Sequence, residues 1–342
     1  MALAAQTALP QLLTDKVFIA EPRIKSGSAN PAPKLSTLIA GMCAGADSID
    51  DLDVVRSGGM KTLFDGVYAP STIGTLLREF TFGHARQLES VLREHLAELC
   101  ARVDLLPGAS ERAFIDIDSL LRPVYGHAKQ GASYGHTKIA GKQILRKGLS
   151  PLVTTISTAT GAPVIAGARL RAGKANSGKG AARMVAQAIA TARAAGVAGP
   201  ILVRGDSAYG NSTVAAACRR AGAQFSLVLN KTRAVAVAIE SIDDSAWIPV
   251  QYPGAVFDPD TRAWISDAEV AEITHTACTS TNNPITARLI VRRVKDARYP
   301  DALFPVWRYH PFFTNTDEPT AAEGAFGRRQ LFATVDHGAD GA

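Results

Sequence analysis

The stretch that decides the fold is residues 200–230, "PILVRGDSAYGNSTVAAACRRAGAQFSLVLN". It opens with a short apolar run, continues through an alanine-rich helical segment and ends in a second apolar run. Compact apolar runs indicate buried strands, and the order strand, helix, strand is typical of a sheet with helices packed on it. Asp206 therefore follows a buried strand. The letters of Arg204 to Ser207 also spell an adhesion tetrapeptide, but that function needs an exposed extracellular loop.

The residues before this stretch continue the same architecture. "AFIDIDSLL" (113–121) is a short β-prone run, and residues 152–171 read as two strands around the turn "TGAP". The alanine-rich segment 178–196 is periodic and predicts a helix. The resulting order is strand, hairpin, helix, strand, helix, strand. It predicts an α/β fold with a mixed sheet flanked by helices.

Residues 1 to about 110 read as helical. Residues 71–100 carry apolar side chains at helical spacing, and no strand-like alternation appears before the break at Pro107 and Gly108. Short helices joined by residues 56–70 allow a helix-turn-helix-like unit. A plain helical packing domain explains the same pattern, and it is the favoured reading.

Composition limits the compartment and the partners. The 37 Lys and Arg exceed the 31 Asp and Glu by six, a basic balance that permits a polyanion partner without requiring one. No run reaches the ~18 apolar residues of a membrane span, and the first residues make a poor signal peptide. The four cysteines lie far apart, which fits a reducing cytoplasm. We expect a cytoplasmic protein with no membrane association.

Three aspartates are the candidates for chemistry. Asp116 and Asp118 are two apart on one predicted strand, so they share a face of the sheet, and Asp206 ends a later strand. A carboxylate beside an apolar strand is costly unless it is paired, and a divalent cation is one such partner. Two such strands can hold Mg²⁺ ions that support phosphoryl transfer. The alternative is that these aspartates cap turns or helices.

"GKANSGKG" (173–180) matches the spacing of a phosphate-binding P-loop. Gly180 stands where that loop needs Ser or Thr to hold magnesium, and no partner acidic strand is evident. A flexible basic turn that contacts phosphate is the better interpretation.

Several stretches in order resemble the DDE transposases of bacterial insertion sequences, in the actinobacterial group with a β-strand insertion. This family belongs to the ribonuclease-H-like superfamily. The stretches are "GADSIDDLDVVR", "APSTIGTLLREFTFGHARQL", "FIDIDSLLRPVYGHAKQGASYGH", "LRAGKANSGKGAARMVAQAIATARAAG", "VRGDSAYGN", "WISDAEVAEI", "ARLIVRRV" and "FPVWRYHPFFTN". They run through nearly the whole chain up to about Asp317.

The resemblance implies a division of the chain and a reaction. It implies a helical N-terminal domain (1–110) that binds transposon ends, a ribonuclease-H-like core (111–234), a β-rich insertion (235–305) and a return to the core with an aberrant tail (306–342). It also implies DNA cleavage by metal-activated water, followed by strand transfer. Asp118 matches the first catalytic and metal-binding aspartate, although Leu120 stands where the family has Thr, and Asp206 matches the second. Asp116 is the reserve candidate, and the cofactor is Mg²⁺ or Mn²⁺.

The third acid of the family has no clear match. Arg328 and Arg329 match the Arg pair that opens the family's last helix, but no glutamate stands near Thr334, where one is expected. Asp336 is a weak stand-in, and Glu318 and Glu323 come too early. We therefore expect a truncated or frameshifted copy that is catalytically defective.

The implied partner is DNA, as the terminal inverted repeats and the target, with a homodimer on the DNA. The residues expected to contact phosphates are Lys129, Lys138, Lys142, Arg146, Lys147 and Lys179. Arg169, Arg171 and Lys174 are expected to extend this basic surface. Two rival hypotheses are a truncated DNA-binding regulator of transposition and a metal-dependent nuclease of the same fold.

Overall fold

The computed structural model describes residues 2–20, 23, 25–64, 66–127, 129–139, 142–250, 257–259, 263–264, 267–281, 283–296, 298–299 and 303–317. The chain forms two compact units. One comprises Met1–Leu105 with Thr191–Gly196, and the other comprises Leu106–Ala190 with Val197–Ala342. The finer four-part division expected from the sequence stays a prediction.

The first unit is helical, as predicted. Its elements are α1 (Ala2–Gln6), α2 (Leu9–Lys16), α3 (Lys25–Ser28), α4 (Pro31–Cys43), the 3₁₀ helices η1 (Asp50–Arg56) and η2 (Gly58–Thr62), α5 (Pro70–Glu79) and α6 (Phe82–Cys100).

The periodic stretch 71–100 is two helices rather than one. Helix α5 ends at Glu79, and α6 begins after Thr81. The Thr81 side chain accepts from the backbone of the third helical residue, His84, while His84 Nδ1 accepts from Thr81 N at 2.9 Å. This reciprocal cap satisfies N–H groups that would otherwise lack partners, so a new helix starts there.

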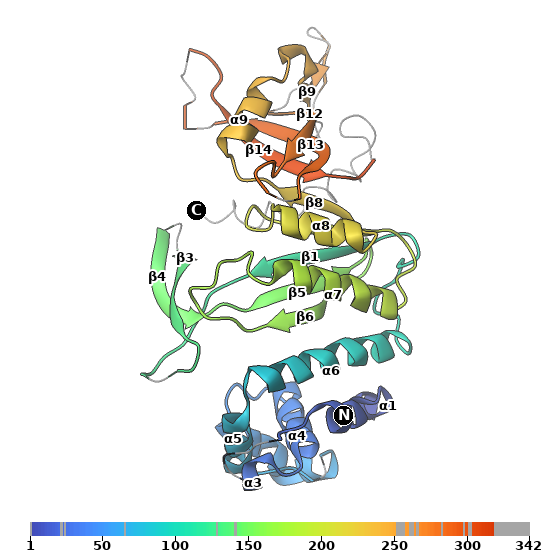
Figure 1. Ribbon diagram of the computed structural model, residues 1–342. Helices are drawn as coiled ribbons and strands as arrows, with labels where there is room; N and C mark the ends of the chain where they lie inside the picture. Colours follow the sequence, from blue (N-terminus) through green and yellow to red (C-terminus); the bar gives the residue numbers. More distant parts are fainter. Residues whose placement is uncertain are drawn as a thin grey trace. The chain divides into compact units, whose positions relative to one another are not determined.

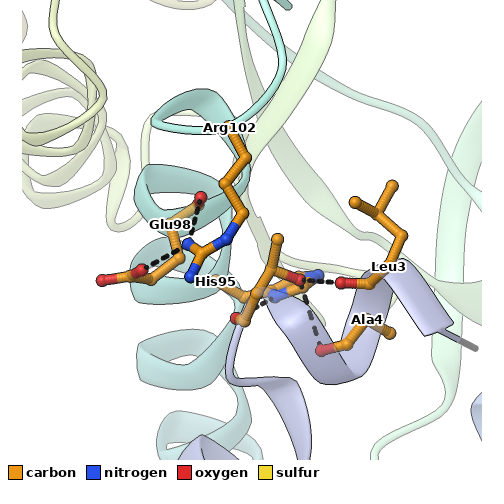
Figure 2. Close-up of polar contacts among 6 residues, drawn as sticks. Leu3, Ala4, His95, Glu98 and Arg102 are labelled. Atoms are coloured by element: carbon orange, nitrogen blue, oxygen red, sulfur yellow. Dashed lines mark hydrogen bonds and ion pairs between the residues drawn. The ribbon is translucent and has the colours of Figure 1, made fainter.

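Helix α6 contacts other helices of the first unit through both apolar and polar groups. Leu9, Leu13, Leu35, Leu76 and Val91 belong to one buried cluster that joins α2, α4, α5 and α6. Figure 2 shows polar contacts made by the same helix. His95 Nδ1 of α6 lies 3.2 Å from the carbonyl oxygen of Thr7, just after α1, and Arg102 donates to Glu98 at 3.1 Å. The apolar cluster supplies most of the stability, because exposed ion pairs contribute little.

The second unit is built on a nine-stranded mixed sheet, whose strand order is β6-β5-β1-β7-β8-β14-β13-β12-β9. Its strands are β1 (Ala113–Ser119), β5 (Leu152–Ser157), β6 (Val164–Arg169), β7 (Ile201–Gly205), β8 (Gln224–Val228), β9 (Ile248–Pro249), β12 (Ala268–Ala277), β13 (Ile285–Lys295) and β14 (Trp307–Thr314).

Five of these strands form the predicted ribonuclease-H-like core. Strands β1, β5 and β6 are antiparallel neighbours, while β7 runs parallel to β1 and β8 runs parallel to β7. The hairpin predicted over 152–171 is the β5–β6 pair, and the strand, helix, strand reading of 200–230 is β7, α8 (Ser212–Arg220) and β8. The predicted fold class is therefore confirmed.

Helix α7 (Ala181–Ala194) and α8 cover one face of this core sheet (Figure 1). A Cβ built on Gly167 of β6 would lie 3.1 Å from Met184 Cε of α7, which shows how closely α7 packs on the sheet. Ile115 and Ile117 of β1 are buried on the face carrying Thr154, which borders the same glycine. Each such buried side chain contributes about 1.5–3 kcal/mol by leaving water.

The predicted β-rich insertion continues the core sheet. After α9 (Arg233–Glu240) and the 3₁₀ helix η3 (Asp244–Ala246), β9, β12 and β13 pair in antiparallel fashion, and β14 joins β13 to the core strand β8. A small two-stranded sheet, β10 (Phe257–Asp258) and β11 (Ala263–Trp264), lies within the same segment.

A basic β-hairpin is an element that the sequence reading missed. Strands β3 (Ser133–Ile139) and β4 (Lys142–Leu149) pair with each other and with β2 (Arg122–Pro123) in a separate three-stranded sheet. This hairpin arm contains four of the residues expected to contact phosphates, Lys138, Lys142, Arg146 and Lys147. Among the described helices, none combines the length and the apolar character that a bilayer crossing requires.

Candidate active site

Two aspartates meet at the carboxyl ends of two neighbouring interior strands of the core sheet. Strands β1 and β7 are parallel neighbours in which Ile117 lies opposite Gly205. Asp118 is the next residue of β1, and Asp206 directly follows the end of β7, so the register brings them side by side. Both residues are exposed at the strand ends. The structure therefore joins the two aspartates that the sequence singled out.

Backbone N–H groups orient both carboxylates. Asp118 Oδ1 accepts from Ser119 N at 2.6 Å, and Asp206 Oδ1 accepts from Ala208 N at 2.9 Å. The pKa of Asp118 is raised above its usual value, mainly because the surrounding protein partly desolvates its carboxylate, and also because Asp206 is negative. Neither carboxylate has an ion-pair partner among the described residues. Two oriented, unneutralised carboxylates are a donor set that fits a divalent cation.

Asp116 lies one row behind Asp118 on the same face of β1, and it has a different partner. It lies opposite Arg204 of β7, whose Nε and Nη2 donate to its two carboxylate oxygens at 2.7 Å each. The Arg204 guanidinium also lies over the Phe114 ring, 4.6 Å from its centroid. An aspartate held by two such bonds is already neutralised, so this geometry favours Asp118 over Asp116 as a metal ligand.

Gly205, the last residue of β7, makes room for the loop that follows the strand. A Cβ at Gly205 would lie 3.0 Å from Tyr209 Cβ and 3.2 Å from Ile117 Cγ2. The chain therefore turns back beneath the strand end, and Tyr209 is 1% exposed. Asn211 then caps α8, its Oδ1 accepting from Val214 N at 3.1 Å. Glycine stands between Arg204 and Asp206 because of this packing.

The buried Tyr209 hydroxyl lies behind the acid pair. Its Oη has no hydrogen bond of good geometry among the described residues. Burial raises the pKa of Tyr209 to about 12, and the negative charges of Asp118 and Asp206 add to this, against the lowering effects of the nearby Ser119 hydroxyl and Arg171. Tyr209 is therefore a neutral phenol at physiological pH.

The basic residues predicted to contact DNA lie mostly on the hairpin arm. Lys142, Arg146 and Lys147 belong to β4, and Lys129 lies in the loop before β3. Lys147 donates to the carbonyl oxygen of His127 at 2.9 Å, so part of its role is to hold this loop. Lys138 is in β3, but its side chain lies outside the described residues.

Two further basic residues, Arg171 and Lys179, lie in the segment between β6 and α7. Lys179 is exposed there. The expectation that Arg171 adds to the exposed basic surface is wrong, because Arg171 is only 9% exposed. Its guanidinium donates to backbone carbonyl groups of the same segment. Sequence reasoning missed this role, since spacing alone does not distinguish a buried arginine from a solvated one.

The third acid of the predicted site is not among the described residues. Asp336, with Glu318 and Glu323, lies outside them. Within the described part of the chain, no group of three or more His, Cys, Asp and Glu side chains is placed to hold a metal ion. The described candidate site therefore consists of Asp118 and Asp206.

Comparisons with known proteins identify the family. The chain resembles the piggyBac transposase in a synaptic complex with hairpin DNA at 12% identity and a TM-score of 0.42, over 96% of this chain and 61% of that one. The chain thus spans less than two thirds of the length of that transposase. No curated protein matches. The family model described as "Transposase DDE domain group 1" matches residues 23–304. Because this match covers most of the chain, the protein belongs to the DDE transposase family, group 1.

Proposed function

We propose that this transposase holds a divalent cation, Mg²⁺ or Mn²⁺, between Asp118 and Asp206 and uses it to cleave and join DNA at the ends of an insertion sequence. The observation that supports this proposal is the register of β1 and β7, which sets the two carboxylates side by side in a member of the DDE family.

The residues of the chain have distinct parts in this proposal. Asp118 and Asp206 hold the cation, and the N–H groups of Ser119 and Ala208 keep the two carboxylates oriented. The bound ion supplies activation of a water molecule and stabilisation of the leaving oxygen. Arg204 neutralises Asp116, so the row behind the site does not compete for the ion.

The proposed reaction has two phosphoryl transfers. In the first, a water oxygen forms a bond to the phosphorus at the transposon end, and the bond from phosphorus to the 3′ oxygen breaks, which frees a 3′-hydroxyl. In the second, that hydroxyl forms a bond to a target phosphorus, whose own 3′ oxygen leaves. Each step moves one proton from the attacking oxygen to the leaving one. Positioning and charge stabilisation supply most of the catalysis in such transfers.

We further propose that this copy performs both steps poorly. The support is in the sequence, where Thr334 stands near the position at which related transposases have a glutamate, and Asp336 is a weak substitute. Placement of catalytic ligands within about 0.5 Å decides activity, so a misplaced third acid leaves little of it.

DNA is the proposed partner, both as terminal inverted repeats and as target, with two copies of the chain acting together in the cytoplasm. The exposed Lys129, Lys142 and Arg146 support this, since clustered cations on one arm suit a phosphate backbone.

One experiment separates the proposal from its rivals. The protein is mixed with labelled duplexes carrying the element's terminal repeats, Mn²⁺ or Mg²⁺, and a target plasmid. Joined products support the transposase, nicked ends without joining support a nuclease, and binding without nicking supports a regulator. We expect binding, with at most a trace of nicked or joined product.

Matched variants identify the site in the same assay. Asp118→Asn and Asp206→Asn should each abolish the residual nicking and leave DNA binding intact. Asp244→Asn, an exposed aspartate in η3, is the control and should change neither. Nicking that persists in Asp118→Asn at the level of the unchanged protein would exclude the acid pair as the catalytic site.

A further inference from the structure

The loop 173–180, between β6 and α7, is held by one buried guanidinium. Arg171 Nη1 donates to the carbonyl oxygens of Asn176 at 3.2 Å, Ser177 at 2.9 Å and Lys179 at 2.9 Å. Its Nε and Nη2 donate to the carbonyl and hydroxyl oxygens of Ser150 at 3.1 and 3.2 Å. Nη1 thus holds the glycine-rich segment, while Nε and Nη2 fix the guanidinium itself against Ser150.

The start of this loop is packed against the hairpin arm through glycines. A Cβ at Gly173 would lie 2.2 Å from Ser133 O and 2.5 Å from Gly148 O, and a Cβ at Gly135 would lie 2.1 Å from Gly173 O. Lys174 N also donates to Ser133 Oγ at 2.8 Å. Only glycine allows backbones to approach this closely, so the arm and the loop cross in one defined place.

The far end of the loop reaches the acid pair. Ser177 Oγ lies 3.3 Å from Ser119 Oγ, and Ser119 follows Asp118 directly. A Cβ at Gly178 would lie 3.7 Å from Ala208 O in the segment after Asp206. The loop therefore connects the basic arm to the two aspartates, while Lys174 and Lys179 are exposed along it.

We propose that loop 173–180 is a binding site for a phosphate of the DNA backbone next to the acid pair, and that Arg171 is the positioning residue that holds this loop in its binding conformation. The proposal rests on the proposed function. It assigns the phosphate contacts to Lys174 and Lys179, whose side chains have no ion-pair partner among the described residues. Arg171 itself is buried and acts only through the loop.

The alternative source of a phosphate is a free nucleotide, because the loop has most of the P-loop spacing. Gly180 supplies no hydroxyl for a magnesium ion, so we infer the DNA backbone instead. The test therefore includes about 1 mM ATP as a competitor, a concentration that would saturate a micromolar nucleotide site. Displacement of DNA from the unchanged protein by ATP, but not from Lys179→Gln, would overturn the assignment.

The main measurement is the salt dependence of binding to a fluorescent duplex of arbitrary sequence. The slope of the logarithm of the association constant against log salt is negative, and removing one cation that neutralises a phosphate lowers its absolute value by about 0.9. Lys174→Gln and Lys179→Gln should each produce such a decrease. Lys295→Gln, an exposed lysine at the end of β13, is the matched control and should leave the slope unchanged.

Arg171→Lys tests the positioning role, because it keeps the charge and removes the planar fork of donors. If Arg171 acts through the loop, this variant lowers the absolute value of the slope although no DNA-facing charge is removed. Adding Lys179→Gln to it then produces no further decrease. Independent, additive effects would overturn the positioning role. If Arg171→Lys fails to fold in a thermal scan, Ser150→Ala removes a single acceptor and should also lower the absolute value of the slope.

The outcomes distinguish this inference from the proposed function. Absence of salt-dependent DNA binding by the unchanged protein would overturn both. Binding whose slope is the same in the unchanged protein and in both lysine variants would overturn only the loop site and leave the acid pair and the hairpin arm as they are.

Discussion

The two aspartates of β1 lie on the same face of the sheet, in two successive rows across β1 and β7, and their negative charges have different neighbours. In the rear row, Asp116 lies opposite Arg204, and the two form a bidentate ion pair. In the front row, Asp118 lies beside Asp206, so two negative charges face each other. The residue on the neighbouring strand therefore decides whether an aspartate of β1 is a structural partner or a candidate metal ligand.

Removing the ion pair of the rear row should have the largest effect on the free energy of unfolding. Arg204→Met leaves the Asp116 carboxylate, 25% exposed, without its partner. We expect the free energy of unfolding to fall by about 3 kcal/mol, because removing one member of a largely buried pair strands the other charge. Urea denaturation at neutral pH measures this loss.

The control for that prediction removes both charges. The double variant Arg204→Met with Asp116→Leu should recover most of the stability, because an apolar pair of similar volume suits this position. A loss below about 0.5 kcal/mol in the single variant would mean that the rear row is solvated like a surface ion pair.

Gly205 lies on the strand between the two rows, and it should be next in effect. In Gly205→Ala the new methyl group would lie 3.0 Å from Tyr209 Cβ, so the loop after β7 must shift. We expect a loss of about 2 kcal/mol in stability, as for other overpacked sites. Gly59→Ala is the matched control, since a Cβ there meets nothing within 4 Å. Equal urea midpoints for the two variants would contradict the packing argument.

The variant Tyr209→Phe tests whether the buried Tyr209 hydroxyl contributes to stability. Because the Tyr209 hydroxyl is buried without a hydrogen bond of good geometry, its removal should leave stability unchanged or raise it by about 1 kcal/mol. Thermal unfolding measures the shift in Tm. A marked drop in Tm would instead mean that Ser119 accepts a hydrogen bond from this hydroxyl.

The smallest effect is expected for the cost of ionising Asp118 in the front row, which comes mainly from the partial burial of its carboxylate and secondly from the negative charge of Asp206. The pKa of Asp118 is raised above its ordinary 3.8, so without metal the protein loses stability as pH rises from that value through the raised pKa. Asp118→Asn should remove this loss, with a gain of about 0.5 kcal/mol at neutral pH after solvent screening. Thermal scans from about pH 3.5 to about pH 7 follow it.

Metal addition tests whether the carboxylates of the front row bind a cation. Mn²⁺ should raise the Tm of the unchanged protein near neutral pH, and less so as pH falls toward the pKa of Asp118, because the bound form needs both carboxylates ionised. Asp118→Asn should show no such rise. A rise that survives in Asp118→Asn would place the cation elsewhere.

Much of this architecture was predictable from local pattern. The apolar runs of β1, β7 and β8 and the periodicity of α7 and α8 are short-range signals, and the structure contains these elements at the expected places. The hairpin arm was missed because Lys142 to Lys147 alternate weakly and carry charge, which resembles a solvated loop. Likewise, the division of residues 71–100 into two helices depended on the cap formed by Thr81 and His84.

The sequence by itself determined the mixed α/β fold and the three candidate aspartates, because these depend on residue type and short spacing, and its ordered stretches carry the resemblance to the family. Only the tertiary structure decided which aspartate has a cationic partner, since strand register pairs residues about 90 positions apart, such as Asp116 and Arg204. It also decided that Arg171 is a buried support rather than an exposed contact. Burial and register are properties of the assembled sheet, and no local stretch of the chain contains them.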